Sequence, residues 1–533
     1  MTAWTLRAAD LLATQAQERP GADAIIAPDA RWSWATLALE TRRRAGAMHA
    51  LGLRRGDRVA ILLPNGAEWV ALFLAAASLG CVTIPVNTRL RGPEIAELLG
   101  RTRAKALFAT DRFLSQDYVK MLREAEPALD TALPGPAWPE LRHVVLAGVS
   151  LPSGAMPHTA FLALPEPEGL DAAMAGVSAE DPMLIQFTSG TTSRPKGAVL
   201  TQHSMLRNAA ACAARLGVRP EDRYLNCRPF FHVAGSTLTL LVCLVTGATL
   251  VTPAAFAAPE AARLLMEEGC TLTSGNDTIF QMLLDEPSLD RARLRLRGGW
   301  AASGPVTMRR IAVELGAAAI CNAYGLSEAS PNVGISDAMD SLEDRAEGWL
   351  LPHEGMEVAL DPGTGEIRVR GWSVMQSYLD DPDGTKRAII ENGWLLTGDL
   401  GAMDTRGRFR MVGRLKDVFR VGGENVAPAE VEEALQAHPD IAVAQVVGVP
   451  DARLGEVPAA FILPRAGAMP EPAAILAWLR PRLAGFRLPR HVWLVDGFES
   501  IGMTASGKVQ KTRLREEALR RIWEASASPA SDG

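Results

Sequence analysis

Cysteine is scarce in this sequence of 533 residues, and its six copies are scattered along the chain. No two of them form a CxxC pair, and none stands at the Cys/His spacing of a zinc site. This pattern argues against a structural zinc site and against the disulfide framework of a small secreted protein. We therefore expect buried free thiols in a reducing cytoplasm.

The sequence also lacks an excess of positive charge and a long uninterrupted apolar run. Its net charge is −6, so nothing predicts the concentrated basic surface of a nucleic-acid-binding protein. The longest apolar run, 70–86, is broken by polar and small residues and falls short of the ~20 apolar residues of a membrane span. The stretch 1–13 carries Arg7 and Asp10 and does not look like a signal peptide. We expect a cytoplasmic protein with no integral membrane segment, and the sequence leaves a homodimer open.

Lysine is the rarer of the two strong bases. The 55 basic residues comprise seven lysines and 48 arginines. A chain that uses arginine almost everywhere is expected to keep lysine where arginine would not serve. Three of the seven, Lys196, Lys416 and Lys508, fall inside glycine-marked motifs.

Helices and short apolar strands alternate in the first third of the chain. The pattern predicts a helix over 33–51 with Ser33 as its N-cap, a strand over 58–63, a helix over 68–79 and a strand over 81–85. A strand–helix–strand order predicts a parallel sheet covered by helices. The stretch 134–168 is rich in proline and glycine and is expected to be an irregular surface connection.

The length predicts at least two domains. We expect an α/β fold with a large N-terminal domain, residues 1–415, that combines helix-covered mixed or parallel sheets with a β-rich part near its end. A small mobile α+β domain is expected over 416–524, followed by a disordered tail, 525–533. The elements expected in the small domain are helices over 428–437 and 472–483 and strands over 441–449, 459–463 and 491–495.

The strongest motif is Thr188-Ser-Gly-Thr-Thr-Ser-Arg-Pro-Lys-Gly197, which follows the apolar stretch 183–187. Glycines let backbone N–H groups approach phosphate oxygens, hydroxyls donate hydrogen bonds, and lysine supplies a compact positive charge. The motif is not a Walker A loop, because G-x4-G-K is absent. The alternative is a solvated turn, which this order of ten residues does not favour.

The loop resembles the phosphate-binding loop of the ANL adenylating superfamily, whose pattern is roughly [ST]-[ST]-G-T-T-G-x-P-K-G, with Ser193 in place of the second family glycine. The acyl-CoA synthetase branch of this superfamily is the one that the chain is most similar to. The resemblance implies ATP contacts from Thr188, Ser189, Gly190, Thr191, Thr192 and Lys196.

A second motif, Tyr324-Gly-Leu-Ser-Glu328, is similar to the Y-G-x-T-E motif of the same superfamily. The resemblance implies that Tyr324 packs on adenine, that Ser327 contacts the α-phosphate and that Glu328 holds Mg²⁺, with Thr191 as a second candidate ligand. A carboxylate beside a triphosphate makes sense with a metal between them. The rival interpretation, a hydrolase nucleophile elbow, lacks the final glycine of G-x-S-x-G. Further ATP contacts implied by resemblance are Ser303, Gly304, Pro305, Asn322 and Gly325.

The later motifs follow in the order of the superfamily. Trp394-Leu-Leu-Thr-Gly-Asp399 matches W-x-x-T-G-D, which implies that Asp399 accepts hydrogen bonds from both ribose hydroxyls. Arg414 would also reach the ribose, and Lys416 stands at the hinge between domains. The resemblance places Arg420, Gly422 and Gly423 on the CoA tunnel. Lys508, in Thr504-Ala-Ser-Gly-Lys-Val-Gln-Lys511, takes the position of the adenylation lysine, a point charge between the substrate carboxylate and the α-phosphate.

The segment Pro229-Phe-Phe-His-Val-Ala-Gly235 resembles the aromatic segment beside the acyl pocket. His232 would then lie near the substrate carboxylate, although a core histidine is the alternative. No aspartate stands between Pro229 and Leu241 to bind a substrate ammonium group, so an α-amino acid is not expected. Asn276 and Asp277 either give the pocket a polar feature or shape a turn, and the sequence does not decide between them.

Together the motifs imply an ATP-dependent carboxylic acid–CoA ligase that works through acyl-AMP on a medium-chain or aromatic acid. ATP, Mg²⁺ and coenzyme A are the expected cofactor and co-substrates. The expected catalytic residues are Lys508, His232, Glu328 and Ser327. Two alternatives remain at this point: an acyl-AMP ligase that loads an acyl carrier protein, and a nucleotide-binding regulator without turnover.

Overall fold

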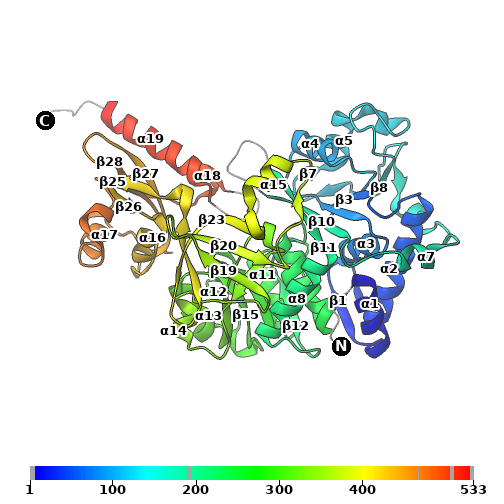
Figure 1. Ribbon diagram of the computed structural model, residues 1–533, viewed down its shortest axis with the longest axis horizontal. Coiled ribbons are helices and arrows are strands. Elements are labelled where there is room, and N and C mark those ends of the chain that lie inside the picture. The colour runs from blue at the N-terminus through cyan, green and yellow to red at the C-terminus, as the bar shows by residue number, and fades with distance from the viewer. Residues whose placement is uncertain (1–6, 189–194, 466, 504–508, 528–533) are drawn as a thin grey trace. The chain divides into compact units, whose positions relative to one another are not determined.

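The computed structural model describes residues 7–188, 195–465, 467–503 and 509–527. For residues 525–527 it describes the backbone alone. The chain divides into two compact units (Figure 1). The first comprises Met1–Ser303, Thr307–Glu357 and Arg370–Leu395, and the second comprises Gly304–Val306, Val358–Val369 and Leu396–Gly533.

The first unit contains, within its described residues, a nine-stranded sheet. Its middle strands run parallel, and antiparallel strands lie at both edges. In spatial order the strands are β18 (Leu351–Pro352), β17 (Asn332–Ile335), β16 (Ala319–Gly325), β15 (Gly298–Ala302), β14 (Leu272–Asn276), β12 (Arg223–Asn226), β13 (Thr249–Val251), β1 (Asp23–Ile26) and β2 (Arg31–Ser33).

An eight-stranded sheet forms the other half of this unit, counted over the same described residues. Its order is β21 (Ser377–Tyr378), β11 (Lys196–Thr201), β10 (Pro182–Thr188), β4 (Val82–Pro85), β3 (Arg58–Leu62), β5 (Ala106–Thr110), β8 (His143–Ala147) and β9 (Met156–Pro157). Strands β4, β3, β5 and β8 are parallel and buried, which is why they read as continuous apolar runs. The expected helix-covered α/β architecture is confirmed.

The helices that cover this sheet begin where the sequence predicts. Helix α2 (Trp34–Ala50) starts at Ser33, whose hydroxyl oxygen accepts a hydrogen bond from the backbone N–H of Thr36. Helix α3 (Ala67–Ser78) joins β3 to β4 and is buried along almost its whole length. The prediction of a strand–helix–strand unit over this region is therefore confirmed.

A buried ion network ties α2 to α3. Arg44 of α2 donates to Glu40 and Glu68, and Glu68 also contacts His158 Nε2 at 2.8 Å, at the start of α6 (His158–Leu162). Burial disfavours the charge on Glu68, but the hydrogen bonds from His158 and Arg44 outweigh it and lower the pKa of this carboxyl to about 2.

Replacing Glu68 by glutamine is expected to lower the free energy of unfolding by about 2 kcal/mol at neutral pH, because Arg44 loses a partner while only 3% of its side chain is exposed. The folded pKa of Glu68 is depressed, so its contribution is complete above the unfolded carboxyl pKa of about 4.3 and is lost as the pH falls toward about 2. The check is denaturant unfolding of both proteins between neutral pH and about pH 3. A stability gap that stays constant over this range would contradict the assignment.

The stretch 134–168 differs from the prediction. It is not only an irregular connection, because it contains β8, β9 and α6, and Val144, Val145 and Leu146 of β8 are buried. The five residues His143–Ala147 pair in parallel with β5. Flanking prolines and glycines obscured a short apolar strand that only the neighbouring strand stabilises.

The second unit has its own core and contains the small α+β layer that the sequence predicts. Strands β27 (Ile441–Asp451) and β28 (Gly455–Pro464) form a long antiparallel hairpin, and β29 (His491–Leu494) pairs in parallel with β28. Helices α16 (Pro428–Gln436) and α17 (Pro472–Leu479) cover this sheet through Val431, Leu435 and Ile475.

Helix α19 (Lys511–Ala527) was not predicted. It packs against β27 through Leu514 and Ala518, and Figure 1 shows it as the red helix beside that hairpin. The helix includes residues 525–527, the first three of the expected tail, whereas 528–533 lie outside the described residues.

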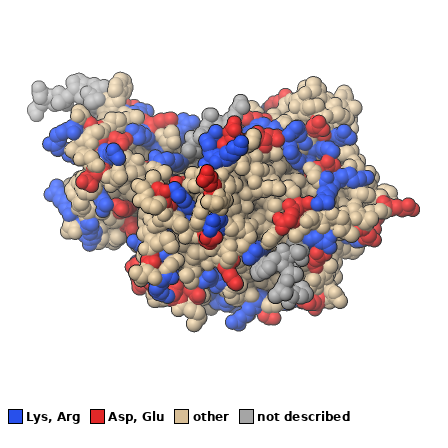
Figure 2. Space-filling model, in the orientation of Figure 1, with Lys and Arg blue, Asp and Glu red and all other residues tan. Residues whose placement is uncertain are grey.

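On the face shown in Figure 2, basic and acidic side chains are interspersed.

Candidate active site

The predicted phosphate loop connects two antiparallel strands. Thr188 ends β10 and pairs with Lys196, the first residue of β11, and the Thr188 hydroxyl donates to the carbonyl oxygen of Lys196 at 3.4 Å. The hairpin therefore holds both ends of the loop in a fixed register. Ser189, Gly190, Thr191 and Thr192 lie outside the described residues, so their contacts remain predictions.

Lys196 is connected to Glu328 through an aromatic side chain that sequence reasoning missed. The ammonium group of Lys196 lies over the ring of Tyr378, 4.8 Å from its centroid, and the Tyr378 hydroxyl donates to Glu328 Oε1 at 2.9 Å. Strand β21 pairs with β11, which brings Tyr378 beside the loop. Burial, together with the negative charge of Glu328 and the hydrogen bond to it, raises the pKa of Tyr378, so its hydroxyl stays a donor at neutral pH. The phosphate-loop lysine and the predicted metal ligand thus face one side chain.

Replacing Tyr378 by phenylalanine is expected to reduce the rate of acid-dependent pyrophosphate release about three- to tenfold and to raise the Mg²⁺ concentration required, because Glu328 loses the donor that orients it. Tyr118 offers a matched control: its buried hydroxyl donates to the carbonyl of Thr88 at 2.6 Å. Tyr118→Phe should change thermal stability without changing the Mg²⁺ dependence. An unchanged Mg²⁺ dependence in Tyr378→Phe would contradict this positioning role.

Glu328 lies in a short 3-10 turn, Ser327–Ala329, which follows β16. Its carbonyl oxygen accepts a hydrogen bond from Met375 N at 2.7 Å. Gly325, at the end of β16, is needed for close approach: a Cβ there would lie 2.1 Å from the carbonyl oxygen of Pro331. The turn is therefore held at its entry and at Glu328 itself.

Three buried polar residues form hydrogen bonds with one another and with the backbone just before this turn. Asn332 of β17 donates through its amide to the carbonyl of Tyr324 at 3.1 Å, and the Asn208 amide donates to the carbonyl of Asn332 at 2.7 Å. His353 Nε2 lies 2.6 Å from Asn332 Oδ1. Burial lowers the pKa of His353 to about 4, so the ring is neutral at neutral pH and donates from Nε2. None of these three was predicted, because no local motif marks them.

The residues predicted along the adenine lie at the carboxyl ends of β15 and β16. Asn322 Nδ2 donates to the carbonyl oxygen of Ser303 at 3.0 Å, which joins the two strand ends. Parallel α/β sheets bind ligands at this edge. Pro305 begins helix α13 (Pro305–Glu314), directly after Gly304.

His232 begins a buried helical segment formed by α9 (Val233–Gly235), the π-helix η2 (Ser236–Leu241) and α10 (Val242–Thr246). Its Nδ1 accepts a hydrogen bond from Ala234 N at 3.1 Å, so the neutral ring carries its proton on Nε2. Asn276 caps helix α12 (Asp277–Leu284) by accepting from Ile279 N at 3.2 Å. Of the two roles left open for Asn276, this is the turn-shaping one, and the pocket role remains a prediction.

In the second unit, the predicted ribose residues lie on adjacent strands. Asp399 of β23 (Trp394–Met403) is paired in register with Arg414 of β24 (Phe409–Arg414), and Arg414 Nε lies 3.2 Å from Asp399 Oδ1. Only 5% of the Asp399 side chain is exposed. Lys416 follows in a 3-10 turn, and burial lowers its pKa.

The predicted tunnel glycines form the turn between β25 (Phe419–Val421) and β26 (Glu424–Val426). Gly422 and Gly423 have φ values of 59° and 96°, which a residue with a side chain rarely adopts. A Cβ on Gly423 would meet nothing within 4 Å. The turn geometry alone thus accounts for both glycines, and contact with CoA remains a prediction. Arg420 Nε donates to Asn425 Oδ1 across the same hairpin at 3.2 Å.

Lys508 lies outside the described residues, but the chain on either side of it is anchored. Met503 and Val509 form an antiparallel bridge, and Lys511 pairs with Glu432 and donates to the carbonyl of Val446 at 2.9 Å. The bridge brings the ends of the segment 504–508 together. Lys511 was expected only as part of the motif, and its partners show that it fixes the motif to α16 and β27.

Two protein-family models match this chain. The family model described as AMP-binding enzyme matches residues 12–379, and the model described as AMP-binding enzyme C-terminal domain matches residues 430–508. The chain belongs to the AMP-binding enzyme family.

Two relatives and one solved structure are similar to this AMP-binding enzyme over nearly its whole length. The 3-[(3aS,4S,7aS)-7a-methyl-1,5-dioxo-octahydro-1H-inden-4-yl]propanoyl:CoA ligase of Mycobacterium tuberculosis is 38% identical over 94% of this chain and 96% of its own. The medium-chain acyl-CoA ligase ACSF2, mitochondrial, of Homo sapiens is 31% identical over 96% of this chain and 87% of its own. The ATP-bound crystal structure of MatB from Rhodopseudomonas palustris has a TM-score of 0.78 and 26% identity, over 97% of this chain and 99% of its own.

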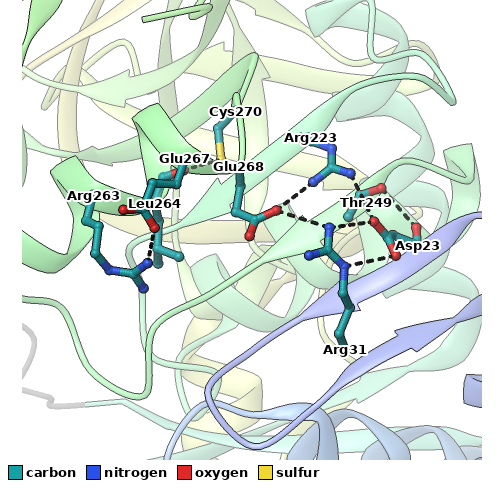
Figure 3. A network of polar contacts seen from close by, with 9 residues as sticks. All are labelled: Asp23, Arg31, Arg223, Thr249, Arg263, Leu264, Glu267, Glu268 and Cys270. Carbon is teal, nitrogen blue, oxygen red and sulfur yellow. Dashed lines mark hydrogen bonds and ion pairs between the residues drawn. The ribbon is translucent and has the colours of Figure 1, made fainter. Parts of the chain in front are cut away.

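A surface cavity of about 780 Å³ in this AMP-binding enzyme lies away from the strand ends described above. Its lining includes Arg223 and Glu268, at the amino ends of the parallel strands β12 and β14, and Arg31 of the antiparallel strand β2. Figure 3 shows that Arg31 and Arg223 both pair with Asp23 and Glu268. These arginines therefore fix the β1–β2 hairpin to the sheet.

No helix among the described residues of the AMP-binding enzyme is long and apolar enough to cross a membrane.

Proposed function

We propose that this chain is an ATP-dependent carboxylic acid–CoA ligase that forms acyl-AMP, releases pyrophosphate and then transfers the acyl group to coenzyme A. Family membership and identity of 31–38% with CoA ligases over nearly the whole chain make it an AMP-forming acyl-CoA ligase. The observation that carries the catalytic proposal is the arrangement of Lys196, Tyr378 and Glu328 at the end of the phosphate-loop hairpin.

In the first half reaction a carboxylate oxygen of the acid attacks the α-phosphorus of ATP, and pyrophosphate leaves. Thr188 and Lys196 bind the departing phosphates, and Ser327 contacts the α-phosphate. Tyr324 and Asp399 orient the nucleoside. Lys508 stabilises the negative charge that builds between the two reactants.

His232 is proposed to position the acid. Its Nδ1 accepts a hydrogen bond from the N–H of Ala234, so in the neutral tautomer the proton lies on Nε2, a donor that an acceptor oxygen of the acid would match. A carboxylate oxygen is such an acceptor, and the hydrogen bond would orient its second oxygen for attack.

Glu328 fits a magnesium site of the kind found with nucleotide substrates. Among the described residues, no three His, Cys, Asp or Glu side chains gather as a metal site. Mg²⁺ is usually bound through one or two carboxylates together with substrate phosphates, so one oriented carboxylate suffices. Bound there, Mg²⁺ would neutralise charge on the phosphates, and the chain's contribution is to hold Glu328 through Tyr378.

For the second half reaction we propose that residues 416–524 form the mobile domain, with 1–415 as the larger domain and Lys416 as the hinge. The thiol of CoA attacks the carbonyl carbon of acyl-AMP, and AMP leaves. Arg420, Gly422 and Gly423 line the path of the pantetheine arm, where a backbone without side chains permits close passage.

The acid is proposed to be a medium-chain or aromatic carboxylic acid, acting in the cytoplasm. The helical segment 233–246 beside His232 is buried and mainly apolar, and one relative is named for medium-chain acids. The absence of an aspartate between Pro229 and Leu241 disfavours an α-amino acid.

The test is release of pyrophosphate from ATP with a panel of acids, with and without CoA. Acid-dependent release and CoA thioester in equal amounts are expected. Thioester formation only on an acyl carrier protein would indicate the carrier-loading alternative. ATP binding without acid-dependent pyrophosphate would indicate a regulator.

A further inference from the structure

Arg228 stands between β12 and the His232 segment, with its backbone held on both sides. Its N–H donates to Asn226 Oδ1 at 3.2 Å, and its carbonyl accepts from the amides of Asn226 and Asn65 at 2.7 and 2.9 Å. Asn226 is fully buried and Asn65 nearly so. The direction in which the Arg228 side chain leaves the backbone is thus set by the fold.

The guanidinium of Arg228 has no acidic partner among the residues that the structure describes. It lies 6.0 Å from the centroid of the Trp300 ring. Desolvation by burial lowers the pKa of Arg228 to about 10, so the guanidinium is still charged at neutral pH. The residue is half-buried. Comparable arginines in the same unit, Arg44 and Arg297, each pair with a carboxylate. A charge in such surroundings is costly unless an acceptor meets it.

Trp300, whose ring centroid lies 6.0 Å from this guanidinium, carries a second donor. Trp300 Nε1 is buried and has no hydrogen-bond partner among the described residues, and only 3% of Trp300 is exposed. Arginine and the indole N–H are donors only. The pair therefore matches a ligand oxygen that accepts hydrogen bonds.

Each of these two residues is close in the sequence to a residue of the proposed site. Arg228 precedes His232 by four positions, and Trp300 precedes Ser303 by three on β15. Gly235 contacts the same backbone, since a Cβ there would lie 2.3 Å from the carbonyl of Pro229 and 3.1 Å from that of Arg228. The helical segment that begins at His232 thus packs directly on the Arg228–Pro229 backbone.

We propose that Arg228, with Trp300, selects a carboxylic acid whose acyl part carries a second acceptor oxygen, a ketone or a second carboxylate. The inference rests on the proposed function, because it takes the His232 segment as the acyl site. The apolar helical segment accommodates the carbon skeleton, and Arg228 binds the distal oxygen. Arg228 is a specificity-determining residue in this view and takes no part in the attack on ATP.

The test compares acids of equal length in sets of three: a plain monocarboxylic acid, the corresponding oxo acid and the dicarboxylic acid. For each set kcat/KM of CoA thioester formation is measured with the native enzyme, Arg228→Met, Arg228→Lys and Trp300→Phe. Methionine keeps an apolar stem over the Trp300 ring, and phenylalanine keeps the aromatic surface while removing the N–H. Thermal unfolding of each variant reports on the fold.

We expect the native enzyme to favour an acid with a second oxygen over its plain counterpart by tenfold or more, and Arg228→Met to reduce this ratio by about 10–100-fold. Arg228→Lys should retain part of the preference, and Trp300→Phe should lose less than Arg228→Met. A native ratio near one would overturn the inference while leaving the proposed function intact. An equal loss for all three acids in Arg228→Met would overturn it too, because Arg228 would then serve the reacting carboxylate. If no acid supports thioester formation, the proposed function fails and the inference with it.

Discussion

Lys508→Ala is expected to slow acid-dependent pyrophosphate release by about 10²–10³-fold, the usual cost of losing one well-placed charge in a transition state. The reason is its position in the motif 504–511, where the sequence keeps one of only seven lysines. In the first half reaction a compact ammonium group offsets charge between two anions, the carboxylate and the α-phosphate.

The second half reaction provides the internal control for this variant. When synthetic acyl-AMP and CoA are supplied, Lys508→Ala should form thioester at a rate close to that of the native enzyme, because no new charge develops on phosphorus. Lys508→Arg keeps the charge but changes its shape, so it should lie between alanine and the native residue. Equal loss in both half reactions would contradict the assigned role of Lys508.

Asp399→Ala is expected to raise the dissociation constant for ATP by roughly 10²-fold, since hydrogen bonds to a charged acceptor contribute about 1.5–3 kcal/mol each and two ribose hydroxyls lose theirs. The structure gives Asp399 a nearly buried carboxylate, paired with Arg414 on the adjacent strand. Calorimetric titration with ATP measures the change directly.

A matched control separates nucleotide binding from loss of an ion pair. Asp404 pairs with Arg408 in the same unit, with Oδ2 2.7 Å from Nε. Asp404→Ala should lower thermal stability to a similar degree as Asp399→Ala but leave ATP affinity unchanged. If both variants weaken ATP binding equally, or if neither does, Asp399 does not hold the ribose.

Most of the elements could be predicted because their signals are local. The Ser33 cap, the apolar strands β3 and β4, and the helices and strands of the small domain follow from side-chain periodicity and capping chemistry within a few residues. Strand β8 was missed because it has only four consecutive apolar residues, 144–147, between segments rich in proline and glycine, and it is stabilised by pairing with β5.

The supports of the site could not be predicted for the same reason. Tyr378 lies 50 positions from Glu328 in the chain, and Asn208 lies 124 from Asn332. Such contacts depend on which strands become neighbours in the sheets. The spacing of residues along a single sequence does not show which strands will pair. The scarcity of tyrosine, four in the whole chain, is the one sequence feature that could have drawn attention to Tyr378.

The central claim is that the acid's own carboxylate oxygen attacks the α-phosphorus of ATP. It is tested most directly with an acid labelled with ¹⁸O in its carboxyl group, in the presence of ATP, Mg²⁺ and CoA, followed by mass spectrometry of the nucleotide product. The account predicts AMP that carries one ¹⁸O atom, formed together with CoA thioester and pyrophosphate. Unlabelled AMP, or ADP and phosphate in place of AMP and pyrophosphate, would contradict it.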